Sequence, residues 1–292
     1  MNRNWRVETP GGPLVLRRYN RARTGPAVLW EHTLLGFASG RGWPVPNPIP
    51  TRTGSTLLEH DSRLWSASHF LEGEPGSADS PGMRRIYGVL LARLHHDLTT
   101  FGSEGQRPGF GKTWELDAPV ETAGAGTFNE LVAAFSRDYP ELGSAVRRQR
   151  YRNLRELSRL HYPDLPDRPI HGDFQPKNLL FKDAQPTGIL DFDQARRDAL
   201  VCDIAPLLMP FQPLDLRHCA ALLEGYESVR LLSDQEWDLL PALVRAALLW
   251  WVAFLLVRWR TEGGEPAGIA RTMNQRFPAF DSAEKGIRTL RH

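Results

Sequence analysis

Residues 171 to 178 read H-G-D-F-Q-P-K-N, and residues 188 to 193 read G-I-L-D-F-D. An apolar stretch follows the first segment and another lies within the second, so both acidic clusters are placed beside predicted strands. Asp173 stands five residues before Asn178, and Asp191 follows that Asn after thirteen more. These side chains offer a carboxylate that can accept a proton and oxygen atoms that suit Mg²⁺. The two segments therefore predict a centre for phosphoryl transfer, a reaction in which the protein mainly positions groups and stabilises charge.

The spacing of the first segment matches the catalytic loop of protein kinases, H-R-D-x-x-x-x-N, which is followed by a metal-binding Asp on a D-F-G turn. Gly172 stands in place of the Arg, and Asp193 stands in place of the Gly. In this form the sequence resembles the aminoglycoside phosphotransferase and choline kinase family, also called the phosphotransferase enzyme family, over about residues 3 to 260. The resemblance implies a kinase that uses ATP and Mg²⁺ and phosphorylates a hydroxyl group of a small molecule.

The resemblance also assigns roles at the catalytic centre. Asp173 is expected to be the catalytic base that takes the proton of the acceptor hydroxyl. Asn178 and Asp191 are expected to bind the Mg²⁺ ions through their side-chain oxygens. Asp193 is expected either to assist at a second metal or to cap the segment after it.

Two further residues are expected to support this centre. His171 is expected to pack against the metal-binding turn and to bond it, with a metal-ligand role as the alternative. Asp203, in V-C-D-I-A, resembles a family Asp that braces the catalytic loop from the following helix. A lone H-G-D would more often be a turn with a capping Asp, because Gly and Asp both favour turns. Two motifs in the right order favour the kinase interpretation.

The pattern along the chain predicts an α+β, protein-kinase-like bilobal fold. Residues 1–72 are predicted to form a small β-rich N-lobe that binds the nucleotide, with a hairpin around T-P-G-G and one helix from Pro26 to Ala38. Residues 73–292 are predicted to form a larger, mainly helical C-lobe for catalysis and substrate binding. Its expected helices are Met83 to Leu98, Phe128 to Tyr139, Leu142 to Leu160, Leu216 to Arg230 and Asp234 to Arg260, with residues 100 to 127 as loop.

ATP is expected in the cleft between the lobes, near the connecting residues His69, Phe70 and Leu71. Kinases anchor the phosphates with a Lys on a strand, paired to a Glu on the next helix. The four lysines of this chain, at positions 112, 177, 182 and 285, all lie outside the N-lobe. The resemblance therefore gives this role to Arg17, with Glu31 as its partner, and Arg suits phosphate and carboxylate contacts. Arg18 is expected to face the opposite way.

The N-lobe departs from the family at its start. A Gly-rich loop over the phosphates is expected between the first two strands, but only M-N-R-N precedes Trp5. The first strand is therefore expected to be missing, either because the chain is truncated or because the lid is shortened. A four-stranded sheet with an exposed edge at Trp5 to Glu8 should result. The G-K-T at residues 111 to 113 is not a Walker A motif, because position 106 is Gln where that motif needs Gly.

Composition excludes several other classes of protein. The net charge of +2 is too small to imply a nucleic-acid partner. Cys202 and Cys219 form no metal-ligand or disulfide framework, and the N-terminus shows no secretory signal, so a cytoplasmic location is expected. The longest apolar run, Ala246 to Val257, is bounded by Arg245 and Arg258 and is too short to span a bilayer. It predicts a buried helix and no membrane partner.

The acceptor is the least determined part of the prediction. Residues 224 to 248 resemble the C-lobe of bacterial homoserine kinases of this fold, although Ser233 and Glu236 are also a plain capping box. Homoserine is therefore the leading acceptor. The alternatives are choline or ethanolamine, a sugar, or an aminoglycoside. For choline, Trp250, Trp251 and Trp259 could contribute to an aromatic cage. A nucleotide-binding protein of the same fold without turnover is the remaining alternative.

Overall fold

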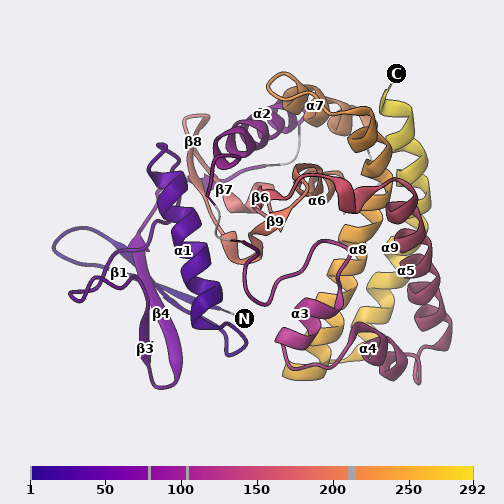
Figure 1. Ribbon diagram of the computed structural model, residues 1–292, viewed down its shortest axis with the longest axis horizontal. Helices are drawn as coiled ribbons and strands as arrows, with labels where there is room; N and C mark the ends of the chain where they lie inside the picture. The colour runs from indigo at the N-terminus through magenta and orange to yellow at the C-terminus, as the bar shows by residue number, and fades with distance from the viewer. Residues whose placement is uncertain (1, 78–79, 103–104, 210–214, 292) are drawn as a thin grey trace.

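The computed structural model describes residues 2–77, 80–102, 105–209 and 215–291. Its two parts are distinct in Figure 1, where a small sheet with one helix lies beside a larger helical body. The chain begins on the sheet near the junction of the two parts, and it ends on the far side of the helical body. The arrangement is an α+β bilobal fold, as the sequence predicts.

The N-lobe sheet contains four described strands, β1 (Arg3–Val7), β2 (Leu14–Arg18), β3 (Leu58–His60) and β4 (Arg63–His69). They pair antiparallel in the order β1-β2-β4-β3. The predicted count of one strand fewer than five is therefore confirmed. Every residue of β1 is exposed, because β2 is its only partner among the described strands. Trp5 stacks on Trp65 with ring centroids 5.6 Å apart, which covers part of this edge of the sheet.

One helix, α1 (Gly25–Ser39), packs between the sheet and the C-lobe. The side chain of Thr24 accepts a hydrogen bond from the backbone N–H of Ala27, and Pro26 lies in the first turn, so the local sequence favours a helix start here. Trp30, Leu34 and Leu35 belong to the buried core, which also includes C-lobe residues. The buried side chain of Glu31, which is also part of α1, therefore lies where the two lobes meet.

The C-lobe contains eight described α-helices that surround the catalytic strands (Figure 1). They are α2 (Pro81–Leu98), α3 (Asp117–Thr122), α4 (Phe128–Phe135), α5 (Pro140–Arg159), α6 (Ala205–Leu208), α7 (Leu216–Glu227), α8 (Asp234–Glu262) and α9 (Pro266–Arg288). Three differences from the sequence prediction stand out. The predicted helix to Tyr139 ends at Phe135, because Pro140 begins the next helix. The short helix α3 lies within the predicted loop, and α9 was not predicted at all.

The long helix α8 is the centre of the C-lobe core. A capping box between Ser233 and Glu236 fixes its start. It is long and apolar enough to span a membrane by composition, but 67% of its most apolar stretch is buried inside the molecule. Most of its buried residues pack in the same cluster as those of α2, α4, α5 and α7. The prediction of a buried helix over the longest apolar run is confirmed.

Short strands of the C-lobe carry the catalytic segments. They are β5 (Glu74–Pro75), β6 (Arg168–Ile170), β7 (Leu179–Lys182), β8 (Gln185–Ile189) and β9 (Arg196–Asp198). Short 3₁₀ turns lie after these strands, at Pro176–Asn178, Phe192–Gln194 and Leu200–Asp203. Two others lie elsewhere, at Tyr162–Asp164 after α5 and at Thr289–Arg291 after α9. Strand β7 pairs with β8 so that Leu179 lies opposite Ile189. The backbone N–H of Leu190 donates to the carbonyl of Asn178 at 2.7 Å, which brings the two motifs together.

Candidate active site

The catalytic loop makes a turn at Gly172 that no larger residue would fit. Gly172 has φ of +80°, and a Cβ there would lie 2.1 Å from the carbonyl oxygen of Gln194. The glycine therefore allows the loop after β6 to pass directly against the segment that follows Asp191. Asp173 follows this turn directly and lines the cleft.

The carboxylate of Asp203 is hydrogen-bonded to the backbone of this turn, in the supporting position that was predicted for it. Its carboxylate accepts the backbone N–H of His171 at 2.6 Å and that of Gly172 at 2.7 Å. Nε2 of the His95 ring lies 3.1 Å from Oδ2 of the same carboxylate. Burial alone would raise the pKa of Asp203, but the hydrogen bond and charge of His95 hold it below its usual range. An ionised, fully buried carboxylate thus fixes two consecutive peptide groups of the catalytic loop.

His171 lies in the position that its predicted supporting role requires, and the role itself stays a prediction. Its Nε2 lies 2.9 Å from the carbonyl oxygen of Leu190, and its Nδ1 accepts the backbone N–H of Asp173 at 3.2 Å. These partners require a proton on Nε2 and a free lone pair on Nδ1. The ring is fully buried and packs on Phe174 and Phe192, with centroids 5.6 and 4.4 Å away. His171 therefore ties the catalytic loop to the turn that carries Asp191.

Asp173 lies at the cleft with three polar neighbours. The amide of Gln175 donates to Oδ1, the amide of Asn178 donates to Oδ2 at 3.0 Å, and the Lys177 ammonium lies 3.6 Å from Oδ2. Burial raises the pKa of this carboxyl above its usual range, and the nearby Lys177 charge opposes that rise. Two amides orient the carboxylate, and burial leaves it more basic than an ordinary Asp despite the Lys177 charge.

Asn178 and Asp191 flank Asp173. The amide nitrogen of Asn178 donates to the carbonyl oxygen and to Oδ2 of Asp173. The amide oxygen of Asn178 is therefore available to another partner. Asp191 adopts a left-handed conformation, with φ of +64°, and its side chain keeps 46% of its surface exposed. Its nearest described cation is Arg17, at 3.7 Å. Both residues thus present oxygen to the cleft.

Of the two roles expected for Asp193, capping of the following segment is wrong, and assistance at a second metal stays a prediction. Instead of capping the segment after it, its buried carboxylate faces the N-lobe, where Arg23 lies 2.8 Å away and Arg17 3.3 Å away. The amide of Asn2 donates to it at 3.0 Å. Burial alone would raise the pKa of Asp193, but the Arg23 and Arg17 charges hold it far below its usual range. With these partners it acts as the counter-ion of two arginines.

The expected pair between Arg17 and Glu31 is wrong. Glu31 accepts a hydrogen bond from Arg107 at 2.5 Å, in an ion pair that is almost fully buried. Arg17 instead lies beside Asp191 and Asp193. The charge of Glu31 still helps to raise the pKa of Arg17, so the acid is a neighbour without being the direct partner.

The predicted alternation of Arg17 and Arg18 is confirmed. The side chain of Arg17 is 17% exposed and reaches Asp191 and Asp193 of the C-lobe. The Arg18 guanidinium lies over the rings of Trp5 and Trp65, at 5.6 and 5.7 Å from their centroids, on the other face of the sheet.

Arg107 is the principal residue that sequence analysis missed. It is completely buried, and its Nη1 donates to the carbonyl oxygens of Phe192, Asp193 and Ala195 at 3.0 to 3.1 Å. Its Nε donates to the carbonyl of Ala27 in α1 at 2.9 Å. No periodic pattern marks it, because it is a single basic residue in a stretch rich in Gly and Pro. Arg23 and Gln175 were also missed, although Gln175 lies inside the segment H-G-D-F-Q-P-K-N, where an amide two residues after Asp173 was the available signal.

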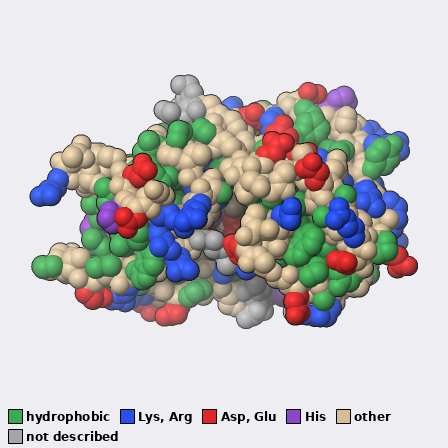
Figure 2. All heavy atoms as spheres, turned by 90° about the horizontal axis from the view of Figure 1, so that it is seen from below, with side chains coloured by type: hydrophobic (Ala, Val, Ile, Leu, Met, Phe, Trp, Pro, Cys, Tyr) green, Lys and Arg blue, Asp and Glu red, His purple; other side chains and the backbone are tan. Residues whose placement is uncertain are grey.

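The candidate catalytic residues line a cleft of about 1220 Å³ between the two lobes. Asp173, Asn178, Asp191 and Asp193 line it from the C-lobe, and Arg17 lines it from the N-lobe. Figure 2 shows Lys and Arg side chains gathered on the N-lobe side of the hollow between the lobes. The connecting residues also line the cleft, namely His69, Phe70 and Leu71.

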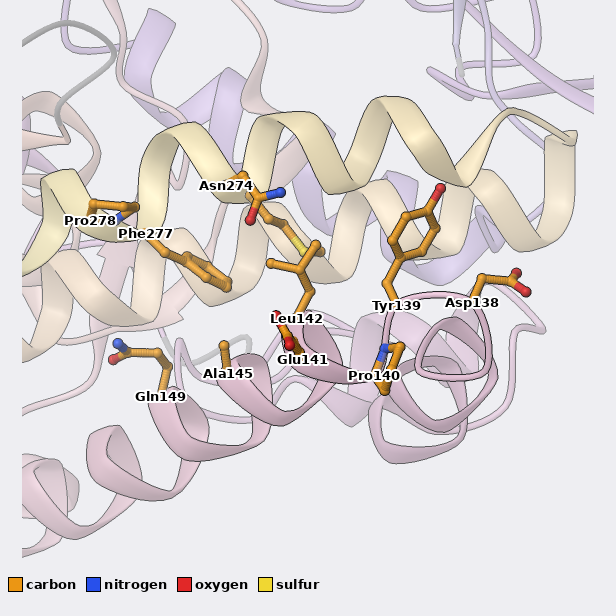
Figure 3. A pocket seen from close by; sticks show the side chains of 11 residues that line it. Asp138, Tyr139, Pro140, Glu141, Leu142, Ala145, Gln149, Asn274, Phe277 and Pro278 are labelled. Carbon is orange, nitrogen blue, oxygen red and sulfur yellow. The ribbon is translucent and has the colours of Figure 1, made fainter.

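A second hollow, of about 610 Å³, lies far from this chemistry. It lies between the start of α5 and the middle of α9, and Leu142 and Phe277 are among the side chains that line it (Figure 3). None of the catalytic-loop residues lines it. The interlobe cleft is therefore the candidate active site.

The fold and this site define a kinase-like phosphotransferase that acts on small molecules. The model of the phosphotransferase enzyme family matches residues 1–232. Since that match covers most of the chain, the protein belongs to the phosphotransferase enzyme family, and it is a small-molecule kinase with a hydroxyl acceptor.

Similar proteins agree with this assignment. The homoserine kinase of Gluconacetobacter diazotrophicus is 32% identical over 276 residues, which cover 91% of this chain and 80% of that protein. The homoserine kinase of Gluconobacter oxydans is 28% identical over 265 residues, which cover 88% and 78%. Among solved structures, the amicoumacin kinase hAmiN in complex with AMP-PNP, Ca²⁺ and Ami has a TM-score of 0.71 at 14% identity, covering 97% of this chain and 85% of that chain. The likeness to this structure shows the fold alone.

Proposed function

We propose that this protein transfers the γ-phosphoryl group of ATP to the hydroxyl of homoserine in a reaction that depends on Mg²⁺. The observation that carries the chemistry is the placement of Asp173, flanked by Asn178 and Asp191, at the cleft between the lobes. The two homoserine kinases that align with most of this chain support the choice of acceptor.

The reaction needs one proton transfer and one displacement. The Asp173 carboxylate accepts the proton of the acceptor hydroxyl as the hydroxyl oxygen attacks the γ-phosphorus. The bond from the γ-phosphorus to the bridging oxygen breaks, and ADP leaves. Gln175 and Asn178 hold the Asp173 carboxylate in place through their amides. Arg17 stabilises negative charge on the phosphates from the N-lobe side.

The residues present fit Mg²⁺. Among the described residues, no cluster of three His, Cys, Asp or Glu side chains forms a metal site alone. Mg²⁺ is commonly held by one or two protein oxygens together with phosphates and waters, and Asn178 and Asp191 offer such a sparse set. When bound, the metal would neutralise charge on the phosphates. A nucleotide and its metal would thus complete the site together.

The charge of the cleft argues against a polycationic drug as acceptor. Its acidic lining residues are fewer than its basic ones, and two of them, Glu31 and Asp193, are already paired with arginines. A pocket for an aminoglycoside would need several unpaired carboxylates. A small zwitterion such as homoserine places no such demand on the site.

The purified protein should convert homoserine and ATP to phosphohomoserine and ADP, with activity lost on EDTA treatment and restored by added Mg²⁺. Turnover is measured by coupled ADP release and by ³¹P NMR of the product, beside choline, ethanolamine, sugars and aminoglycosides. Phosphorylation of another compound in this panel, with homoserine inert, would reject the acceptor but keep the chemistry. Nucleotide binding without turnover of any acceptor would favour a non-catalytic role.

Arg17 and Arg18 provide a matched pair for testing the phosphate anchor. Arg17→Ala should raise the KM for ATP by about 10-fold or more, since a charge-assisted hydrogen bond contributes roughly 1.5–3 kcal/mol. Arg18→Ala should raise it far less, because that side chain lies over Trp5 and Trp65 on the other face of the sheet. Equal effects of the two substitutions on the KM for ATP would refute the assignment.

A further inference from the structure

The C-lobe part of the cleft contains two buried N–H groups that lack a partner. Arg196 is 5% exposed and lines the cleft, and so does Trp250 of α8. The Arg196 Nε and the Trp250 Nε1 have no hydrogen-bond partner among the described residues. The Arg196 guanidinium lies 5.6 Å from the centroid of the Trp250 ring, so the two donors are neighbours. A buried N–H without a partner is costly, which suggests that something absent from the protein itself satisfies it.

The guanidinium of Arg196 also lacks a full counter-charge. Its Nη1 donates to the carbonyl of Gln194 and its Nη2 to the hydroxyl of Thr113, both of which are neutral. Asp198 is its ion-pair partner, at the long distance of 3.5 Å from Nη2, and both side chains are buried. That carboxylate also accepts hydrogen bonds from Thr113, Tyr162 and Ala199. The charge of Arg196 is therefore offset through Nη2 alone, and its Nε–H is still without an acceptor, which an anionic group would supply.

Arg196 is close to the catalytic loop. A Cβ built on Gly172 would lie 2.9 Å from Arg196 Nη1, and Gly172 immediately precedes Asp173. An anionic group bound by Arg196 would thus be a short carbon chain away from a hydroxyl at Asp173. This is the arrangement of a small hydroxy acid, in which a carboxylate and the reacting hydroxyl lie at opposite ends of the molecule.

We propose that Arg196 and Trp250 bind the carboxylate of the acceptor, which makes the acceptor a hydroxy amino acid and excludes amino alcohols. This inference rests on the proposed function, in which a small hydroxyl compound accepts the phosphoryl group. Arg196 supplies the charge, and the indole N–H supplies a second donor. The apolar ring covers the site and excludes water, which strengthens the interaction.

Pairs of acceptors that differ only by the carboxylate test the inference. Homoserine is compared with 3-amino-1-propanol, and serine with ethanolamine, by measuring kcat and KM for each. The carboxylated member of a pair should have a kcat/KM at least about 10²-fold higher, because a site with buried polar groups rejects an analogue that leaves them unpaired. Equal values, or a preference for the amino alcohol, would overturn the inference while leaving the protein a kinase.

Variants then assign the preference to the two residues. Trp250→Phe keeps the ring and removes the N–H, and it should raise the KM for homoserine roughly 10-fold while changing the KM for 3-amino-1-propanol little. Arg196→Lys keeps the positive charge but offers fewer hydrogen-bond donors. It should therefore reduce the ratio of kcat/KM between the carboxylated acceptor and its amino alcohol in each pair. Trp114→Phe is the control, because the Trp114 indole N–H is also buried without a described partner but lies outside the cleft.

The controls separate a binding role from a structural one. All variants should keep the KM for ATP and the melting temperature of the parent protein in the presence of ATP. Equal losses on both members of a pair would show that the residues only support the fold, and the inference would fail. If homoserine is inert but serine is preferred over ethanolamine, the proposed acceptor fails and the carboxylate site stands. If no acceptor is turned over, calorimetry must show tighter binding of the carboxylated member, and equal binding would reject the site.

Discussion

Replacing Asp173 with Asn is expected to lower kcat by about 10² to 10⁴-fold, the usual effect of losing a general base. The substitution keeps the shape of the side chain and removes its ability to accept a proton. Binding of ATP should remain nearly intact, because the nucleotide is held by other residues. Steady-state kinetics and calorimetric titration with ATP measure the two effects separately.

A matched control is available at Asp183, an exposed residue in the turn between β7 and β8. Asp183→Asn should leave kcat unchanged, since Asn tolerates the left-handed conformation found there. Unchanged turnover in Asp173→Asn would reject the assignment of Asp173 as the base. A loss of ATP binding equal to the loss of kcat would point instead to collapse of the loop.

The pH dependence of kcat/KM gives an independent measure of the same carboxylate. The base works only when deprotonated, so activity should fall as the pH falls through the pKa of Asp173. Because burial raises this pKa, the fall should occur at a higher pH than for an ordinary Asp. Lys177→Gln removes the charge that opposes the rise, and it should move the acid side of the profile to still higher pH. A profile that does not move would show that another group controls it.

The second large effect is expected at Arg107, where Arg107→Met should destabilise the fold by about 3–5 kcal/mol, since removing one partner of a buried ion pair leaves an uncompensated charge. Glu31 would be that charge, because it is almost fully buried with Arg107 as its ion-pair partner. Three carbonyl oxygens around residues 192 to 195 would also lose their donor. Urea denaturation monitored by circular dichroism measures the change.

The double variant Arg107→Met with Glu31→Leu tests the cause. Removing the unpaired Glu31 carboxylate should recover part of the lost stability. The part that comes from the hydrogen bonds of Arg107 to carbonyl oxygens should not be recovered. Glu31→Leu alone should also destabilise, since it leaves the guanidinium unpaired. If the two substitutions change the free energy of unfolding additively, the ion pair between Arg107 and Glu31 is not the source of the lost stability.

The catalytic centre was predictable because its chemistry is local in sequence. Asp173 and Asn178 are five residues apart on one loop, and Asp191 follows a short hairpin, so spacing alone brings them near each other. The strands of the N-lobe were predictable from alternation and from Gly at the first turn. The count of four came from the resemblance to the family, because only M-N-R-N precedes Trp5. His171 and Asp203 take their expected supporting positions through hydrogen bonds to backbone groups near them.

The ion pairs were not predictable, because their partners are far apart in sequence. Glu31 lies 76 residues before Arg107, and Arg17 lies 176 residues before Asp193, so no spacing rule selects these partners over others. Helix α9 escaped prediction because two glycines precede it and Pro278 lies inside it. Proline usually interrupts helices, and only tertiary packing overrides that preference here.

The Arg107 contacts also determine which parts of the enzyme can move together. A single guanidinium joins the first turn of α1 to the segment that follows Asp191, and Arg23 and Asn2 add further bonds to Asp193. Separation of α1 from the C-lobe would therefore have to break these bonds first. The sheet is tied less extensively, through Arg17 of β2 to Asp191 and Asp193 and through Asn2 to Asp193. An opening motion that breaks those few contacts would cost less than one that removes Arg107 from its carbonyl partners.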